Sequence, residues 1–241
     1  GLEQTFTFWS VVPPQSVFRG VEELRPGHVR IYEGGRVREL RTWESSYPTR
    51  RELGGQFTGS LDDAVREVRR ALETATSLRI LRADVPVGSY LSGGLDSSLV
   101  AALGRRYAGD RFHTFSLRFE DAEYDETDYQ RQMVQLIGSE HHEVVVRRSD
   151  IADVFPSVIE HTERPILRTA PAPLFLLSKL VREHGIKVVL TGEGADEFFA
   201  GYDLFREGKV RRFWARHPES QLRPRALERL YPYLTRSPVA Q

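Results

Sequence analysis

The chain has 241 residues, 40% of them hydrophobic and 28% charged, which is the composition of a globular protein with enough apolar residues for one sizeable core. Lys plus Arg equal Asp plus Glu at 34 each, so a general nucleic-acid-binding or membrane-binding surface is not expected. No apolar run is long enough to span a bilayer, and the absence of Cys excludes disulfides and cysteine nucleophiles and fits a cytoplasmic protein.

Residues 1–45 are predicted to be β-structure with turns. The stretch TFTFWSVV alternates aromatic and β-branched residues, and HVRIY and RVREL flank a Gly34-Gly35 turn, as in a hairpin. This segment is too short to bury a core of its own, so we expect it to pack on something else. Residues 46–59 carry Pro, Gly and Ser without periodicity and are predicted to be a linker.

A long amphipathic helix is predicted to follow this linker. Ser60 is a typical N-cap residue, and Asp63 three positions later approximates a capping box. Apolar residues then recur at helical spacing from Leu61 to Leu78, which is about five turns.

Beyond this helix, short apolar runs alternate with helical patterns. The predicted strands are VPVGSYL, FHTFSLRF, HHEVVV and IKVVLT. The predicted helices cover residues 98–107, 125–137, 151–161, 173–184 and from 196 onward, and the basic tail from residue 209 is also expected to be helical. Strands that alternate with helices imply parallel strands joined by crossovers, so we expect an α/β protein with helices on both faces of a sheet.

Two strand-to-helix junctions are rich in glycine and polar residues: SGGLDSS, residues 92–98, and TGEGADE, residues 191–197. Ligands of open parallel sheets bind outside the carboxyl ends of the strands, where these junctions lie. In the first junction, Gly93 and Gly94 expose backbone N–H groups, the helix expected to begin near Ser97 has a positive end, and three serines add donors. This composition is typical of a phosphate-binding loop.

Asp96 distinguishes this loop from the common phosphate loop, in which a Lys follows the glycines. A carboxylate beside bound phosphate repels it unless a cation lies between them, and Mg²⁺ is the usual bridge. The alternative is a simple helix-capping turn with Asp96 at the start of the helix.

The second junction repeats this pattern. Glu193 lies between Gly192 and Gly194, ahead of the helix, while Asp196 and Glu197 stand at the helix start, where acids are also common for structural reasons. Two acid-bearing loops at similar sheet positions predict that Asp96 and Asp196 share one metal ion.

These motifs carry a resemblance to a known family. SGGLDSS resembles the pyrophosphate loop of the ATP pyrophosphatase superfamily, and TGEGADEFFAGY the second signature of the glutamine-dependent asparagine synthetases. FEDAEYDETDYQRQMVQLIGSEHHEV resembles the stretch between the two, and FTFWSVVPPQSVFRGVEELRPGHV the end of that family's glutaminase domain. The resemblance implies an adenine nucleotide α-hydrolase-like (ATP pyrophosphatase) domain over residues 60–241, truncated at its C-terminus. The β remnant of an Ntn-type glutaminase domain would precede it.

The resemblance implies that aspartate becomes asparagine through β-aspartyl-AMP, with release of AMP and pyrophosphate and with nitrogen from glutamine in the full-length protein. Glu193 would assist the attack of ammonia, and Asp96 and Asp196 would hold Mg²⁺ on the leaving pyrophosphate. The implied ATP-binding and pyrophosphate-binding positions are Tyr90, Leu91, Ser92, Gly93, Gly94, Asp96, Ser97, Ser98, Leu117, Thr191 and Gly192.

The chain also departs from this family. The glutaminase nucleophile is an N-terminal Cys, but residue 1 is Gly, and Lys209 stands too close to the second signature to be the family's downstream catalytic Lys. The resemblance therefore implies a central piece of a longer protein, acting on small molecules rather than on nucleic acid or membranes. A homodimer is compatible with it. Two alternatives stay open: a β-lactam synthetase or lasso-peptide cyclase acting on another carboxylate, and a silent nucleotide-binding homologue.

His141 and His142 suggest a metal site at first sight. Adjacent residues of a strand point to opposite faces, so we do not expect these two side chains to share one ion.

Overall fold

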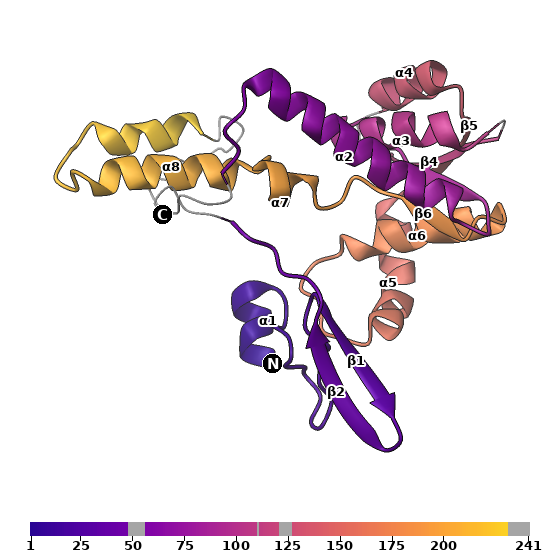
Figure 1. The fold of residues 1–241 in the computed structure, drawn as a ribbon, viewed down its shortest axis with the longest axis horizontal. Helices are drawn as coiled ribbons and strands as arrows, with labels where there is room; N and C mark the ends of the chain where they lie inside the picture. The colour runs from indigo at the N-terminus through magenta and orange to yellow at the C-terminus, as the bar shows by residue number, and fades with distance from the viewer. Residues whose placement is uncertain (48–55, 110, 121–126, 231–241) are drawn as a thin grey trace.

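The computed structural model describes residues 1–47, 56–109, 111–120 and 127–230. A four-stranded sheet in the order β5-β4-β3-β6 forms the core of the α/β part, at one end of the molecule (Figure 1). The strands are β3 Val87–Tyr90, β4 His113–Phe119, β5 Glu140–Val146 and β6 Val188–Leu190. Every neighbouring pair in this sheet is parallel, which confirms the predicted α/β class with a parallel sheet.

Helices cover both faces of this sheet. The helices are α3 Leu95–Tyr107 and α4 Thr127–Ile137 on one face, and α6 Pro171–Glu183 on the other, with α5 Arg148–Thr162 packed on α6. Leu91 and Phe112 pack against α3 and α4, whereas Phe115 packs against Leu177 and Val181 of α6. Residues 121–126, which include the predicted start of the helix at Asp125, lie outside the described residues.

The predicted long helix is α2, Leu61–Leu81, and it packs on α3. Ser60 and Asp63 form the expected capping box, since each side chain bonds to the other residue's backbone N–H. Glu73 of α2 also pairs with Arg106 of α3 at 2.9 Å. The apolar stripe is only partly covered, because Leu61 remains 79% exposed.

The prediction of a strand at TFTFWSVV was wrong, since residues Leu2–Phe8 form a helix, α1. A strand is stable only when its backbone groups pair with a neighbouring strand, and none of the described residues offers one here. The helix satisfies these groups locally, and the hydroxyls of Thr5 and Thr7 bond to the carbonyls of Gly1 and Glu3, four residues earlier.

The predicted hairpin is confirmed. It consists of β1 His28–Glu33 and β2 Arg36–Arg41, which pair in antiparallel register across the Gly34-Gly35 turn. All residues of β2 are exposed, and Figure 1 shows the hairpin pointing away from the parallel sheet. The hairpin therefore adds no apolar layer to the core.

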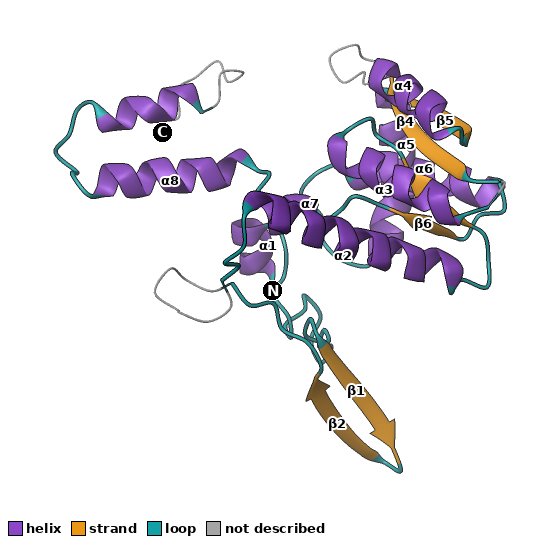
Figure 2. Cartoon of the chain, turned by 45° about the horizontal axis from the view of Figure 1, so that its top comes forward, coloured by secondary structure: helices purple, strands orange, loops and turns teal. Residues whose placement is uncertain are grey.

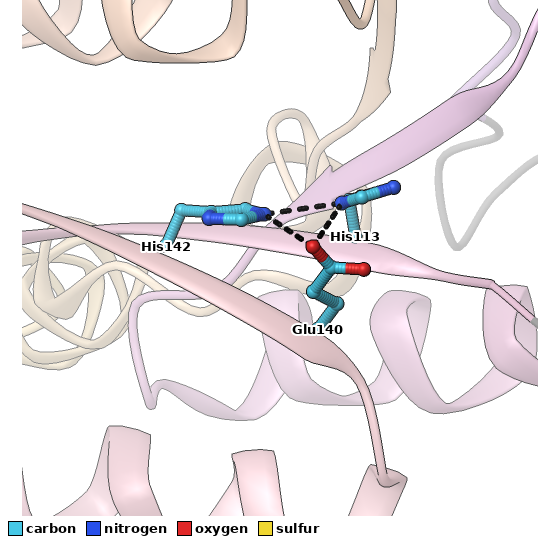
Figure 3. Close-up of side chains that lie close together, drawn as sticks. All are labelled: His113, Glu140 and His142. Carbon is cyan, nitrogen blue, oxygen red and sulfur yellow. Dashed lines mark hydrogen bonds and ion pairs between the residues drawn. The ribbon is translucent and has the colours of Figure 1, made fainter. Parts of the chain in front are cut away.

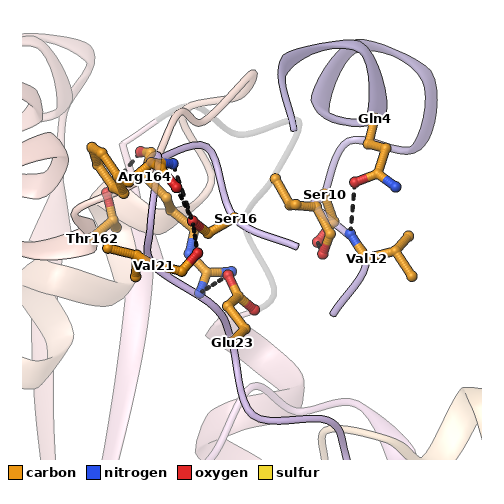
Figure 4. Close-up of polar contacts among 10 residues, drawn as sticks. Gln4, Ser10, Val12, Ser16, Val21, Glu23, Thr162 and Arg164 are labelled. Atoms are coloured by element: carbon orange, nitrogen blue, oxygen red, sulfur yellow. Dashed lines mark hydrogen bonds and ion pairs between the residues drawn. The ribbon is translucent and has the colours of Figure 1, made fainter. Parts of the chain in front are cut away.

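A polar contact joins the N-terminal segment to the loop between α5 and α6. Arg164 forms an ion pair with Glu23 at 3.3 Å, and its backbone carbonyl faces the hydroxyl of Thr162 at 3.4 Å (Figure 4). The guanidinium of Arg168 also lies 5.9 Å from the ring centre of Trp9. These two contacts join the N-terminal segment to the α/β part, whereas most of its large apolar side chains stay exposed. Of the predicted linker, residues 48–55 lie outside the described residues.

The C-terminal part forms a helical pair away from the sheet (Figure 2). Helix α8, Asp203–Ala215, contacts the 3₁₀ helix Arg223–Arg229, and the guanidinium of Arg223 lies 4.2 Å from the ring centre of Phe213. This agrees with the expected helical tail up to residue 230. None of the described helices is both long and apolar enough to cross a bilayer.

Candidate active site

The loop SGGLDSS joins β3 to α3 at the carboxyl end of the sheet. Helix α3 begins at Leu95 with Gly94 as its N-cap, so the prediction of a helix that starts near Ser97 or Ser98 was late by about one turn. Gly94 has extended φ and ψ, and the helix therefore includes Asp96 in its first turn. The N–H groups of this turn have no acceptor within the helix and are available to an anion.

Hydroxyl groups hold this loop in shape. The Oγ atoms of Ser92 and Ser97 lie 2.8 Å apart, and Ser97 Oγ accepts the backbone N–H of Ser92 at 3.2 Å. Ser92 Oγ in turn accepts the N–H of Gly94 at 3.2 Å. These bonds within the loop fix its backbone.

Gly93 is required by its backbone and by its neighbours. Its φ is +86°, in the left-handed region that L side chains rarely adopt. A Cβ atom here would lie 3.0 Å from the backbone N of Gln130 and 3.0 Å from Cβ of Tyr129. The first turn of α4 therefore packs directly on the loop, where only a glycine fits.

The second loop follows β6 and differs from the prediction in one respect. The helix expected from Asp196 onward is interrupted, because α7 covers only Ala195–Phe199. Ala200 then takes a left-handed φ of 58°, and α8 begins at Asp203 after this turn. The break places Tyr202 beside α7 instead of one turn further along a helix.

Tyr202 and Glu197 are coupled across this break. The phenol O–H of Tyr202 donates to Glu197 Oε1 at 2.9 Å. This hydrogen bond raises the pKa of Tyr202, and the negative charges of Glu197, Asp196 and Glu193 act in the same direction. Tyr202 thus lies beside a group of carboxylates that includes Glu197 and Asp196.

The two glycine-rich loops touch each other at Gly192. A Cβ atom at Gly192 would lie 2.8 Å from the backbone N of Ser97 and 2.9 Å from Cβ of Asp96. Pairing of β6 with β3 brings the carboxyl ends of the two strands side by side. The absence of a side chain at Gly192 then allows direct contact between the loops.

A pocket of about 300 Å³ lies where the loops meet. The residues predicted for the site that line it are Tyr90, Leu91, Ser92, Asp96, Ser97, Leu117, Thr191, Gly192, Glu193 and Asp196. The predicted residues Gly93, Gly94 and Ser98 are not in this lining: the glycines shape the loop behind it, and Ser98 is buried in α3. Most of the predicted residues are therefore brought together.

The pocket is acidic. Four carboxylates line it, those of Asp96, Glu193, Asp196 and Glu197, and its described lining contains no Lys or Arg. A polyphosphate would be repelled here unless cations accompanied it. Mg²⁺ is usually held by one or two carboxylates together with phosphate oxygens, so the donor set of Asp96 and Asp196 fits this ion.

Gln130 of α4 is a pocket residue that the sequence reasoning missed. Its Nε2 donates to the carbonyls of Ser92 at 3.3 Å and of Leu117 at 3.0 Å, which joins the first loop to β4. Its Oε1 is buried without a hydrogen-bond partner among the described residues, although Gln130 as a residue lines the pocket. A single glutamine within a helical pattern gives no signal of this role.

Eight further residues line the pocket and were not among the predicted site residues. They come from β4, α6 and the second loop: Phe115, Ser116, Phe119, Leu174, Leu177, Gly194, Glu197 and Tyr202. Those of β4 and α6 follow ordinary strand and helix patterns, so only the fold identifies them. Glu197 and Tyr202 lie within the quoted motif TGEGADEFFAGY and could have been found from it.

A larger cavity of about 900 Å³ borders the pocket at Phe119. Arg147, Arg148 and Arg168 line it, together with Glu120, to which Arg147 is paired at 3.4 Å. The two cavities thus differ in charge: the pocket between the loops is acidic, and its neighbour is largely basic. We assign the chemistry to the smaller one because both glycine-rich loops end there.

Comparison with known proteins gives a consistent result. A family model described as asparagine synthase matches residues 67–240. The chain is 35% identical over 207 residues to a putative glutamine-hydrolysing asparagine synthetase of Mycobacterium tuberculosis, covering 85% of this chain and 31% of the relative. It is 30% identical over 208 residues to glutamine-hydrolysing asparagine synthetase 1 of Bacillus subtilis, covering 86% of this chain and 31% of the relative.

A relative that is named an amidase, and not an asparagine synthetase, has a similar level of sequence identity to this chain. The chain is 33% identical over 210 residues to the amidase chyE of Penicillium rubens, covering 81% of this chain and 31% of that protein. The chain therefore spans about a third of the length of these curated relatives.

Proposed function

Because the chain belongs to the asparagine synthase family, we propose that the protein containing it amidates aspartate to asparagine at the expense of ATP, releasing AMP and pyrophosphate. The observation that carries this proposal is the pocket in which Asp96 and Glu193, from two different loops, line one acidic cavity. A loop that holds phosphates and a loop that carries a free carboxylate are the parts that such a reaction needs.

The first step joins aspartate to the nucleotide. An oxygen of the aspartate side chain attacks the α-phosphorus, and the bond from that phosphorus to the bridging oxygen breaks, so pyrophosphate leaves. The departing group gains negative charge, and donors aimed at it lower the barrier. The N–H groups at the start of α3 and the hydroxyls of Ser92 and Ser97 are suited to this task.

Asp96 and Asp196 are the residues that would hold Mg²⁺, which supplies positive charge against the pyrophosphate. They line the same pocket, and each stands in the first turn of a helix.

The second step forms the amide. The nitrogen of ammonia attacks the acyl carbon of β-aspartyl-AMP, AMP leaves, and the nitrogen gives up a proton. Glu193 lines the pocket between two glycines, ahead of α7, and is the carboxylate placed to receive that proton. In the whole protein, glutamine would provide the ammonia.

The neighbouring cavity supports an anionic second substrate. Arg147, Arg148 and Arg168 line it, and it adjoins the pocket at Phe119. An amino acid with a second carboxylate, such as aspartate, would find favourable charges there while its reacting carboxylate reaches the α-phosphate.

A second candidate is an amidotransferase or cyclase that activates a different carboxylate with the same ATP site. The similarity to a relative named amidase favours this reading.

The deciding experiment measures pyrophosphate release from ATP by the full-length protein, with aspartate and ammonia supplied or withheld. Release of pyrophosphate that requires aspartate, with asparagine formed on addition of ammonia, supports the first proposal. Release with another carboxylate but not with aspartate supports the second. No ATP binding in either case would mean that the site is silent.

A further inference from the structure

A second polar cluster lies at the opposite end of the sheet from the nucleotide pocket. His113 is the first residue of β4, and Glu140 and His142 lie at the start of β5. The pocket is lined by Phe119, at the other end of β4, so the length of the strand separates the two sites. Figure 3 shows the two imidazole rings and the carboxylate pointing toward one another.

Strand register creates this cluster. His113 pairs with Glu140 across the parallel ladder, and His142 projects on the same face as Glu140 because it lies two residues further along β5. His141 points to the other face, where its Nδ1 lies 3.0 Å from the hydroxyl of Thr114. His141 and His142 therefore face opposite sides of the sheet, as predicted, and the partner of His142 is His113 on the neighbouring strand, which was not predicted.

The distances among the three side chains match the needs of a metal ion. His113 Nδ1 lies 3.1 Å from His142 Nε2, and Glu140 Oε1 lies 3.9 Å from the first atom and 3.7 Å from the second. Two atoms each about 2.0–2.1 Å from Zn²⁺ at a tetrahedral angle are separated by roughly 3.3 Å. Shifts of about half an ångström would bring all three atoms into coordination.

His184, the C-cap of α6, is placed beside the cluster. The centre of its ring lies 3.7 Å from that of His142. Its Nδ1 is 2.9 Å from the carbonyl of Leu180, and because a carbonyl only accepts, this nitrogen carries the proton. The Nε2 atom then keeps its lone pair, which is the tautomer that a metal-binding imidazole with such a backbone partner adopts.

An ion can reach the cluster from solvent. A cavity of about 500 Å³ is lined by His113 and His184, and the side chain of Glu140 is 57% exposed. The imidazoles are more sheltered, with 19% of the His113 side chain and 14% of the His142 side chain exposed. Two sheltered nitrogens with one accessible carboxylate leave an open path to a preformed pair of ligands.

We propose that His113, Glu140 and His142 bind a divalent transition-metal ion of the zinc type, with the ring of His184 packed against that of His142. Imidazole and carboxylate together suit Zn²⁺, whereas Mg²⁺ prefers oxygen ligands alone. The ion would clamp β4 and β5 together. This site is separate from the proposed ATP chemistry, so either proposal can fail while the other stands.

The competing interpretation is a metal-free stack of neutral rings. His142 also packs on Phe115, with ring centres 5.2 Å apart, and in such a stack one imidazole N–H would donate to the other across the 3.1 Å gap. Glu140 is then only a surface acid, and its replacement changes nothing that depends on Zn²⁺.

The test measures Zn²⁺ bound to the purified full-length protein after dialysis, with any histidine tag removed, and the thermal midpoint with Zn²⁺ or Mg²⁺ added. We expect stoichiometric zinc and a midpoint several degrees higher with Zn²⁺ only. His142→Gln should abolish both effects, and Glu140→Gln should weaken zinc binding by more than about tenfold. His161→Gln, at an exposed site on α5, is the matched control and should keep both effects.

If His142→Gln does not fold, zinc binding by Glu140→Gln provides the test. This variant should fold, because the Glu140 side chain is largely exposed and a glutamine amide has the same shape as the glutamate carboxylate. Zinc binding equal to that of the unmodified protein in the Glu140 variant would overturn the proposal, as would the absence of stoichiometric zinc in the unmodified protein. If the folded His142→Gln variant keeps ATP–pyrophosphate exchange, the nucleotide pocket functions independently of the histidine cluster.

Discussion

The two ends of the parallel sheet carry polar clusters of different construction. At the carboxyl end, the groups come from two continuous stretches, residues 92–98 and 191–197, in which glycines and acids stand together in the sequence. At the amino end, His113, Glu140 and His142 come from two strands and meet only through their register. The first cluster is therefore visible in the sequence, and the second only in the folded chain.

The contrast has a physical origin. A loop that binds phosphate needs glycines for close backbone approach, and this requirement leaves a local signature. Ligands of a metal clamp need only the right side-chain atoms at the right spacing, and any pair of strands can supply them. The following experiments test whether the pocket at the carboxyl end and the histidine cluster at the amino end of the sheet function independently of each other.

Replacement of Glu193 by Gln should have the largest effect. Loss of a carboxylate that takes a proton typically costs about 10²- to 10⁴-fold in rate. We expect amide formation to fail while ATP–pyrophosphate exchange with aspartate survives, measured in the full-length protein. Glu219→Gln, at an exposed site outside the pocket, is the control and should keep both activities. Equal loss of both steps would argue against a role confined to the second step.

Asp96→Asn should act on the other step. Removing one charged element aimed at a leaving group typically costs about 3 kcal/mol, or roughly 100- to 1000-fold in rate. We expect ATP–pyrophosphate exchange to fall by this factor, while the thermal midpoint and its rise with Zn²⁺ stay unchanged. Normal exchange in this variant would remove Asp96 from the proposed site. A lost zinc effect would show that the two ends are not separate.

Gly93→Ala tests the conformation of the first loop. Gly109 also has a positive φ, +69°, but no other described residue comes within 4 Å of its Cβ position, so Gly109→Ala costs only the backbone strain of about 1–2 kcal/mol. Gly93→Ala adds the clash with Gln130 and Tyr129, which we expect to cost about 1–3 kcal/mol more. Denaturant titration of the two variants gives this difference directly. Equal losses would mean that α4 yields to the added methyl group.

Ser60→Ala should have the smallest effect, since it removes one N-cap from α2, at about 1 kcal/mol of unfolding free energy. The side-chain hydrogen bond from Ser60 lowers the pKa of Asp63, so this carboxylate stabilises the fold above its ordinary pKa of 3.8. The stabilisation is lost as the pH falls through the lower, folded value, so the difference between the two proteins should narrow to the contribution of the bond from the Asp63 backbone N–H to Ser60 Oγ. Ser77→Ala, in the middle of the same helix, should not destabilise and is the matched control. If the difference in unfolding free energy between the unmodified protein and Ser60→Ala did not change at acid pH, the coupling between Ser60 and Asp63 would be contradicted.

Much of this fold could be predicted because the signals are local. The capping box at Ser60, the turn at Gly34-Gly35 and the alternation of strands with helices all follow from neighbours in the sequence. The helix at Leu2–Phe8 could not, because alternation in a short stretch does not reveal whether a partner strand exists. The early start of α3 and the break at Ala200 depend on single backbone angles that these residue types do not dictate.

Only some of the pocket residues could be predicted from the sequence. Asp96, Glu193 and Asp196 stand in motifs that mark them as chemical groups, and the structure brings them to one cavity. Gln130 and Leu177 reach that cavity from α4 and α6 through packing alone. No pattern along the chain connects them to it.

The contact at Gly192 has a consequence for timing. This glycine touches the first turn of α3 on one side and precedes Glu193 on the other. Closely packed atoms transmit small displacements, so relaxation of that turn as pyrophosphate departs would shift the carboxylate of the next step. Because Gly192 has no side chain, departure of pyrophosphate would then be coupled to the movement of Glu193 that the second step needs.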